Sequence, residues 1–356
     1  MIRRMFIAAA GLLAAACFAC VPLAPPPSGG VVLAPAILPA PRTCDASPFV
    51  SKVFTLSSTY APVAGTYQAP LGVKPVGDPF KSDLAAAYCM APPAFQQQLL
   101  ELNGVFITCT DPNNCASSGQ DISTSWGYRE NAGNQSFLQH TYIGLSAGLW
   151  PNGSLMSYSN YEYNIFNDLL MGASLPVTIK ATDSTGNDPT TMTVLAALAH
   201  ELGHIYSWKL GVDDFACGGS YFADISWLHA DKASQYHKFG VETPYSNGKG
   251  NAPKTNRADK DKVLSDINNG NGQENKDLNN IYSGYWASLF ATVAPDEDFI
   301  ETYKLWVLTS MQTQPLASLS VTIPTYVPVD MITLMNTAGK DLNKKRNWVS
   351  NCFKWS

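Results

Sequence analysis

The chain has 356 residues, of which 46% are hydrophobic and 14% charged, and its formal net charge is −5. This balance is typical of a folded protein with a large core and excludes a disordered chain. The acidic excess argues against nucleic acid as a partner, because phosphate binding needs a basic surface. The length suits one large domain or two small ones.

The first residues have the layout of a secretory signal. Arg3 and Arg4 give a positive start, and an apolar run over residues 5–16 follows. We therefore expect residues 1–20 to be a signal peptide and the protein to be exported, to the periplasm, the outer membrane or the medium. An N-terminal anchor is the alternative, although the run is short for a membrane span. Cys17 follows a segment similar to a lipoprotein cleavage box, so attachment to a membrane through a lipid at Cys17 is a further hypothesis.

Residues 21–43 are rich in proline and are expected to form an extended tether before a folded domain over residues 44–356. An even number of cysteines in an exported protein indicates up to three disulfides. The six cysteines beyond the signal are Cys44, Cys89, Cys109, Cys115, Cys217 and Cys352. Only a Cys109–Cys115 pair is suggested by proximity in the sequence.

The first half of the domain alternates helix and strand patterns. Residues 91–103 read as a helix opened by prolines, and residues 105–109 are β-branched and aromatic, which favours a strand. A strand from residue 140, a turn at 151–153 and a helix ending near Gly172 follow. Residues 174–184 are a strand, and Pro176 favours an edge position.

Two helices dominate the second half. From Thr190 to about Leu210, apolar residues recur at three- and four-residue steps, and a second helix opens at Ala294-Pro295 and continues to Met311. Residues 243–281 between them are polar and are expected to be a surface insertion. Within it, residues 266–277 faintly resemble a calcium loop, but a solvated loop is favoured. The fold class predicted is α+β, with a small mixed sheet and a helical C-terminal part.

The segment HELGH lies within the first of these helices. His200 and His204 are four residues apart, so they share a face and can present two imidazoles to one ion. Glu201 is one step round the helix and can reach a water on that ion, which is the physical content of the HExxH pattern. The alternative is a core helix with two hydrogen-bonded histidines, but burying these groups without partners is costly. The small residues beside the motif leave room for close packing: Ala199 and Gly203.

A catalytic zinc also needs a third protein ligand. Glu297 and Glu301 are four apart on the second helix, so one can bind the ion while the other hydrogen-bonds a ligand histidine. We assign Glu297 as the ligand and Glu301 as its support, with the reverse left open. An ordinary acidic helix start is the alternative, and it accounts for Asp296 and Asp298. Other candidate ligands are His229, His237, Asp213 and Asp214.

HELGH followed by EDFIETY resembles the gluzincin metallopeptidases, most closely the lethal-factor-like group and exported bacterial zinc peptidases of that type. The resemblance covers residues 90–310 loosely and is specific only in the two helices. It implies a zincin-like domain that holds one Zn²⁺ per chain, with Glu297 as the third ligand. Lethal-factor-like enzymes also carry an oxyanion-stabilising tyrosine seven residues before that glutamate, where this chain has Phe290. Substitutes for it are Tyr282, Tyr285, His229 and His237.

We therefore expect an exported zinc metallopeptidase that hydrolyses peptides or proteins, in which Glu201 activates a zinc-bound water. The strand around residues 175–180 is expected to bind an extended peptide by strand addition. The alternative is an exported zinc-binding protein of weak or no catalytic activity that serves as an envelope interaction module. Phe290 is the feature that favours this alternative.

Overall fold

Helices and small sheets alternate along the part of the chain that the computed structural model describes, and that part belongs to one compact unit, Cys44–Ser356. The described residues are 44–57, 74–109, 126–129, 141–150, 156–173, 177–210, 216–217, 220–228, 252–253 and 258–353. The predicted signal, the tether, Cys17, Cys115, Asp213, Asp214, His229 and His237 lie outside them. The described residues contain ten α-helices and several small sheets, so the fold class is α+β, as predicted.

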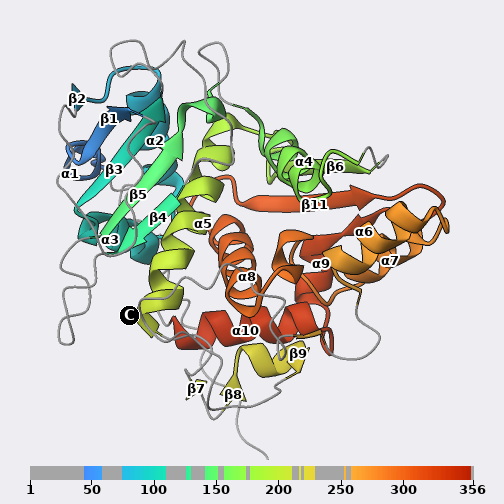
Figure 1. Ribbon diagram of the computed structural model, residues 1–356. Coiled ribbons are helices and arrows are strands. Elements are labelled where there is room, and N and C mark those ends of the chain that lie inside the picture. Colours follow the sequence, from blue (N-terminus) through green and yellow to red (C-terminus); the bar gives the residue numbers. More distant parts are fainter. Residues whose placement is uncertain are drawn as a thin grey trace, which may run out of the picture. The chain divides into compact units, whose positions relative to one another are not determined.

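The larger sheet has five strands in the order β2-β1-β3-β5-β4 (Figure 1). Its three inner strands are parallel, and the two edge strands are antiparallel to their neighbours. β3 and β5 are buried along their whole length, which explains their nearly continuous apolar sequences. The strands are β1 Val53–Ser57, β2 Lys74–Pro75, β3 Gly104–Cys109, β4 Trp126–Arg129 and β5 Thr141–Ser146.

Three short helices accompany this sheet: α1 Ser47–Val50, α2 Phe80–Met90 and α3 Pro93–Glu101. A disulfide joins Cys44 to Cys89 and so fastens the start of the described chain to α2. Cys109 and Cys352 are disulfide-bonded as well. The predicted Cys109–Cys115 pair stays a prediction, because Cys115 is not described.

A second, antiparallel sheet has the order β12-β11-β6, with β6 Thr178–Asp183, β11 Leu316–Thr322 and β12 Val329–Asp330. β6 is an edge strand, as predicted, but α4 (Tyr158–Leu169) covers part of its outer side. The N–H of Ala181 donates to Ser159 Oγ at 2.8 Å, and that of Asp183 donates to the carbonyl of Asn187 at 2.7 Å. Alternate residues of a strand point their N–H groups to the same side. The outward N–H groups of Ala181 and Asp183 are therefore already paired, whereas the segment expected to bind a peptide, residues 175–180, precedes them, and its binding of a peptide stays a prediction.

Helices α5 (Thr190–Leu210) and α8 (Pro295–Thr309) pack against each other at the centre of the unit, and α5 also contacts β4 and β5 of the larger sheet (Figure 1). Both helices were predicted. The periodic apolar residues of α5 are all buried: Met192, Leu195, Leu198, Leu202 and Ile205. Among the described residues, no helix has the combined length and apolarity that crossing a membrane requires.

The predicted surface insertion contains two helices, α6 (Lys260–Asn269) and α7 (Glu274–Ile281). The prediction of a solvated loop over residues 266–277 was wrong, because polar composition concealed two amphipathic helices with one buried face. That face includes Val263 and Leu278, both fully buried. Lys262 Nζ lies 3.1 Å from Asp266 Oδ2 and 2.5 Å from Asp277 Oδ2, so these carboxylates bind a lysine rather than form a calcium loop.

The remaining elements complete the unit. Helices α9 (Met331–Asn336) and α10 (Asp341–Cys352) follow the second sheet, and α10 packs against α8. Two small two-stranded antiparallel sheets pair β7 Ala216–Cys217 with β8 Ser220–Tyr221 and β9 Trp227–Leu228 with β10 Ala252–Pro253. The described residues also form the single-turn 3₁₀ helices η3 Ala147–Leu149, η5 Ala223–Ile225 and η6 Phe290–Thr292.

Candidate metal centre

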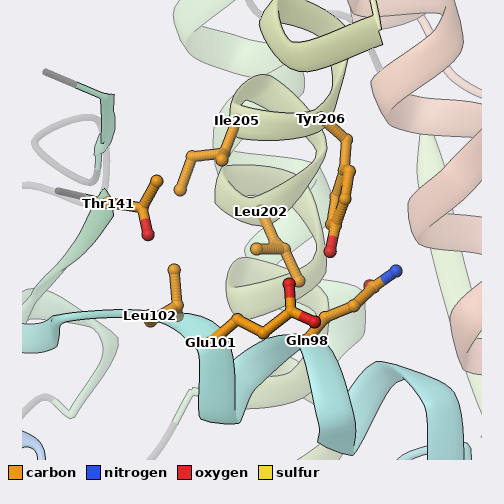
Figure 2. Close-up of a pocket in the computed structure, with 7 residues that line it drawn as sticks. All are labelled: Gln98, Glu101, Leu102, Thr141, Leu202, Ile205 and Tyr206. Carbon is orange, nitrogen blue, oxygen red and sulfur yellow. The ribbon is translucent and has the colours of Figure 1, made fainter. Parts of the chain in front are cut away.

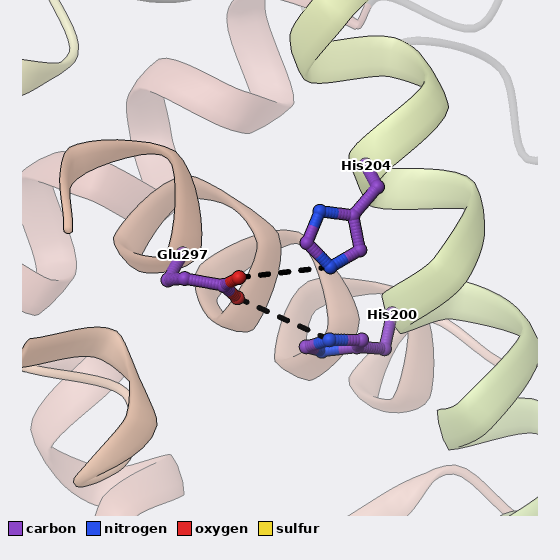
Figure 3. A group of neighbouring side chains, drawn as sticks. All are labelled: His200, His204 and Glu297. Atoms are coloured by element: carbon purple, nitrogen blue, oxygen red, sulfur yellow. Dashed lines mark ion pairs between the residues drawn. The ribbon is translucent and has the colours of Figure 1, made fainter. Parts of the chain in front are cut away.

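Helix α5 presents His200 and His204 to helix α8 (Figure 3). Because the two residues are one helical turn apart, their rings lie one above the other, with centroids 5.0 Å apart and planes at 80°. His200 is buried and His204 is partly buried. The helix therefore directs two imidazole rings into the same space.

A glycine allows α8 to come close enough to complete this group. A Cβ atom at Gly203 would meet Ile300 Cγ2 of α8 at 3.1 Å and Ile300 Cγ1 at 3.3 Å, closer than ordinary packing contacts. The sequence interpretation of Gly203 as a point of close packing is confirmed. The close approach brings Glu297, at the start of α8, opposite the two rings (Figure 3).

Glu297 faces both histidines at distances that suit ligands of one ion. Its Oε1 lies 3.6 Å from His204 Nε2, and its Oε2 lies 3.9 Å from His200 Nε2. Both separations exceed a hydrogen bond. Ligand atoms around a tetrahedral zinc, with bonds of about 2.0–2.2 Å, are separated by roughly 3.4 Å. The three ligand atoms lie within 4.8 Å of one another, so this buried group can hold a metal ion.

Glu301, one turn beyond Glu297, lies on the other side of the His200 ring. Its Oε1 lies 2.8 Å from His200 Nδ1. When Nδ1 donates to this carboxylate, Nε2 carries the lone pair that a metal ion requires. Glu297 therefore faces Nε2 of both histidines, whereas Glu301 faces Nδ1 of His200.

Negative charge accumulates around this group. Four buried carboxylates and one buried lysine surround the histidines: Glu162, Glu201, Glu297, Glu301 and Lys304. Among these five described side chains, carboxylates outnumber ammonium groups. Buried carboxylates are costly unless positive charge lies near them. A divalent cation between His200, His204 and Glu297 would supply such charge, which supports the fit of the site to a metal.

The two histidines differ in their affinity for protons. Burial acts to lower the pKa of His200, but the hydrogen bond to Glu301 and the charges of Glu201, Glu297 and Glu301 raise it overall to about 9. Burial, reinforced by the neighbouring His200, lowers the pKa of His204 to about 3. At neutral pH and without a metal, His200 is therefore protonated and His204 neutral, and metal binding has to displace the additional proton of His200.

The predicted catalytic base, Glu201, is 5% exposed and lies beside this group, since its charge raises the pKa of His200. Its charge also acts on Tyr161 of α4, whose pKa is raised mainly by burial. No local pattern around Tyr161 distinguishes it from the other tyrosines of the chain. Its ring centroid lies 5.6 Å from Lys304 Nζ, so a tyrosine that sequence reasoning missed adjoins the polar group around the histidines.

The structure describes position 290 and two of the residues considered as substitutes for an oxyanion-stabilising tyrosine, Tyr282 and Tyr285. Phe290 packs its ring against His200, with centroids 5.5 Å apart, so position 290 does adjoin the metal centre but has no hydroxyl. Tyr282 is 3% exposed, and burial, then the charge of Glu162, raise its pKa. The carbonyl of Tyr285 accepts a hydrogen bond from Lys345 Nζ at 2.7 Å, beside α10.

Three polar residues of the centre were not found from the sequence: Glu162, Ser288 and Lys304. Ser288 Oγ donates to Glu301 Oε2 at 2.6 Å, and Lys304 Nζ lies 2.8 Å from the same oxygen. Lys304 was visible as a cation three residues after Glu301 in an otherwise apolar segment. Glu162 precedes Lys304 by 142 residues and had no such signal.

A separate small surface hollow lies on another face of α5 (Figure 2). Its lining is Gln98, Glu101, Leu102, Thr141, Leu202, Ile205 and Tyr206. Leu202 lies about 200° round the helix from His200, so the hollow and the metal centre occupy different faces of the same helix. The hollow contains none of the metal-centre residues.

No protein-family model, curated protein or solved structure matches this chain. The fold and the site define an α+β protein with a candidate centre for a metal ion, made of two histidines and one glutamate. The function of that centre therefore has to be inferred from the chain's own residues.

Proposed function

We propose that the chain is a zinc-dependent metallopeptidase with a zincin-like domain. The observation that carries this proposal is the convergence of His200, His204 and Glu297 from two helices, with Glu201 directly beside them. Two imidazoles and one carboxylate suit Zn²⁺, and three protein ligands are the number found in catalytic zinc sites, where one position stays open to water or substrate.

A bound zinc ion supplies a Lewis acid and lowers the pKa of water. The protein's own residues supply the rest. Glu201 accepts a proton from the attacking water and delivers it to the leaving amine, as its burial beside the histidines allows. Glu301 holds His200 by its Nδ1, so the ring keeps its orientation and its tautomer throughout.

The proposed substrates are peptides or proteins, and the proposed location is outside the cytoplasm. The signal-like N-terminus supports export, and the Cys44–Cys89 disulfide is a bond that persists in oxidising compartments. Attachment through a lipid at Cys17 belongs to the same proposal. Fatty-acid labelling that is equal in wild type and Cys17→Ala would reject the lipid.

A second candidate function is zinc binding with little or no catalysis, in an envelope interaction protein. The contact between Phe290 and His200 favours it, because an aromatic ring without a hydroxyl stands where the resemblance implies an oxyanion-stabilising tyrosine. The two functions share the metal centre and differ only in turnover.

Metal analysis and a peptide-library digest of the full chain test both functions. Wild type should carry about one zinc, and Glu297→Ala should lose it. Glu201→Gln should keep zinc and lose cleavage by a factor of about 10²–10⁴. Glu101→Gln, at the end of α3 and in the hollow away from the metal centre, is the control and should retain zinc and cleavage.

The outcomes separate the candidates. Zinc-loaded wild type that cleaves no peptide favours the binding protein. Glu201→Gln that is as active as wild type rejects the peptidase mechanism. Wild type without metal rejects both functions.

A further inference from the structure

Lys304 is a buried lysine that connects the metal centre to a third helix. It is 2% exposed and lies on α8 one turn beyond Glu301. Its Nζ lies 2.8 Å from Glu301 Oε2 and 2.6 Å from Glu162 Oε1 of α4. A single ammonium group thus holds two carboxylates from two helices.

We propose that Lys304 is a positioning residue of the metal centre, which orients Glu301 so that this carboxylate can orient His200. The inference rests on the proposed metal site at His200, His204 and Glu297. It assigns to α8 a third functional residue, at the last position of the series Glu297, Glu301 and Lys304.

The geometry of Glu301 explains why a second support is required. The terminal torsion of a glutamate is soft and has broad minima, so the carboxylate alone does not define which oxygen faces His200. Here Ser288 Oγ and Lys304 Nζ both donate to Oε2, at 2.6 and 2.8 Å. Oε1 is thereby left to His200 Nδ1 at 2.8 Å. Partners of this kind typically change metal affinity by a factor of about 10–100 when removed.

A competing role for Lys304 is to neutralise Glu162 and so to attach α4 to α8. Glu162 is 8% exposed, and Lys304 Nζ also lies 5.6 Å from the ring centroid of its neighbour Tyr161. If this were the whole role, removal of Glu162 together with Lys304 would leave the metal centre unchanged. If Lys304 positions Glu301, metal binding stays impaired when Lys304 and Glu162 are both removed.

The double variant Lys304→Met/Glu162→Gln separates these roles, since Lys304→Met alone leaves two buried carboxylates facing each other and can fail to fold. The readouts are Zn²⁺ affinity by competition with a chelator and the visible absorption of the Co²⁺-loaded protein, which reports ligand geometry without activity. We expect Zn²⁺ affinity to fall at least tenfold and the Co²⁺ spectrum to change. Glu162→Gln alone should keep both near the wild-type values.

Two further variants complete the experiment. Lys345→Met/Asp298→Asn removes an equally buried lysine–carboxylate pair that faces α10 rather than α5, and it should leave the Co²⁺ spectrum unchanged. Lys304→Arg keeps a cationic donor for Glu301 and should recover Zn²⁺ affinity to within about threefold of wild type, which a loss of packing alone would not predict.

Wild-type affinity and spectrum in Lys304→Met/Glu162→Gln would overturn the inference and leave the metal centre standing. The inference also fails if Lys304→Arg binds metal no better than the double variant. A wild-type protein that binds neither Co²⁺ nor Zn²⁺ would overturn the proposed function as well.

Discussion

Glu297 and Asp298 are neighbours in the sequence and are both buried at the start of α8, yet they belong to opposite kinds of environment. Asp298 faces α10 and forms a closed network. Its Oδ2 lies 2.7 Å from Lys345 Nζ and 3.0 Å from Trp227 Nε1. Lys345 itself is fully buried, and its Nζ lies 4.2 Å from the ring centroid of Trp286. One carboxylate meets one lysine at hydrogen-bond distance.

Glu297 faces α5, where the described charges do not balance. It meets imidazole nitrogens at 3.6 and 3.9 Å, among carboxylates that outnumber the one lysine of the group by three. The start of α8 therefore carries a buried carboxylate that pairs with a lysine, Asp298, and a buried carboxylate that faces two histidines, Glu297. A buried charge is thus not by itself a sign of a functional site, whereas several potential metal ligands at suitable distances from one another are.

The largest effect is expected when the buried ion pair between Asp298 and Lys345 is broken. Lys345→Met leaves Asp298 buried without its cation and should lower the free energy of unfolding by about 3–5 kcal/mol, measured by urea denaturation. Lys344→Met is the matched control, because Lys344 is exposed and its pairing with Asp341 is worth less than about 1 kcal/mol. Equal losses in the two variants would contradict the role assigned to Lys345.

The second effect is the stabilisation of the protein by zinc bound at Glu297 and the two histidines. Zinc at about a thousand times its dissociation constant should stabilise wild type by about 4 kcal/mol. Glu297→Gln should lose most of this gain because it removes a ligand, whereas Asp296→Asn, its neighbour on a less buried face of α8, should keep it. Thermal unfolding with and without zinc gives the measurement. A gain in Glu297→Gln as large as in wild type excludes Glu297 as a ligand.

The third effect is a pH dependence of the free energy of unfolding that arises from the buried pair of Asp298 and Lys345. Burial raises the pKa of Asp298 to about 6, although Lys345 and Trp227 act against it. An unfolded aspartate has a pKa near 3.8, so between about pH 4 and 6 the folded chain keeps a proton that the unfolded chain has released. This group should therefore remove up to about 3 kcal/mol of stability as the pH rises through that range.

Asp298→Asn/Lys345→Met removes both members of the pair and should lack this slope. Urea denaturation of the two proteins from pH 4 to 7, with chelator present, provides the comparison. If the free energies of unfolding of the two proteins changed with pH in parallel, Asp298 would not titrate in this range.

The smallest effect tests the approach of the two helices. Gly203→Ala should cost about 1–3 kcal/mol, since its methyl group meets Ile300, and should weaken metal affinity by displacing α8. Adding Ile300→Ala should restore metal affinity but not stability, because it removes the clash and opens a cavity. Undiminished affinity in Gly203→Ala would mean that the ligand set tolerates a wider helix separation.

The helices of the centre could be predicted from sequence because their signals are local. The apolar periodicity of residues 190–210 predicted α5. The four-residue spacings of His200 with His204 and of Glu297 with Glu301 predicted that the members of each pair share one face of their helix. The expectation that Gly203 marks close packing followed from the size of the residue alone. Each of these arguments needs only the geometry of a single helix.

The rest depends on contacts between distant segments. Lys345 of α10 and Glu162 of α4 are brought to α8 by tertiary folding, and nothing in their own sequence neighbourhoods indicates burial. Asp298 was interpreted as an acidic helix start, but it is fully buried and paired with Lys345. Polar composition likewise concealed α6 and α7, whose buried faces are narrow.

The spacing of functional residues along α8 makes the centre sensitive to chain length as well as to composition. Glu297, Glu301 and Lys304 share one side of the helix, and Asp298 is offset from Glu297 by about 100°. An insertion or deletion of one residue after Asp298 would rotate Glu301 and Lys304 away from His200 by that angle while Asp298 kept its partner. Such a change would leave the Asp298–Lys345 pair intact while it moved Glu301 and Lys304 out of reach of His200. The number of residues in α8 is therefore as important for the metal centre as their identity.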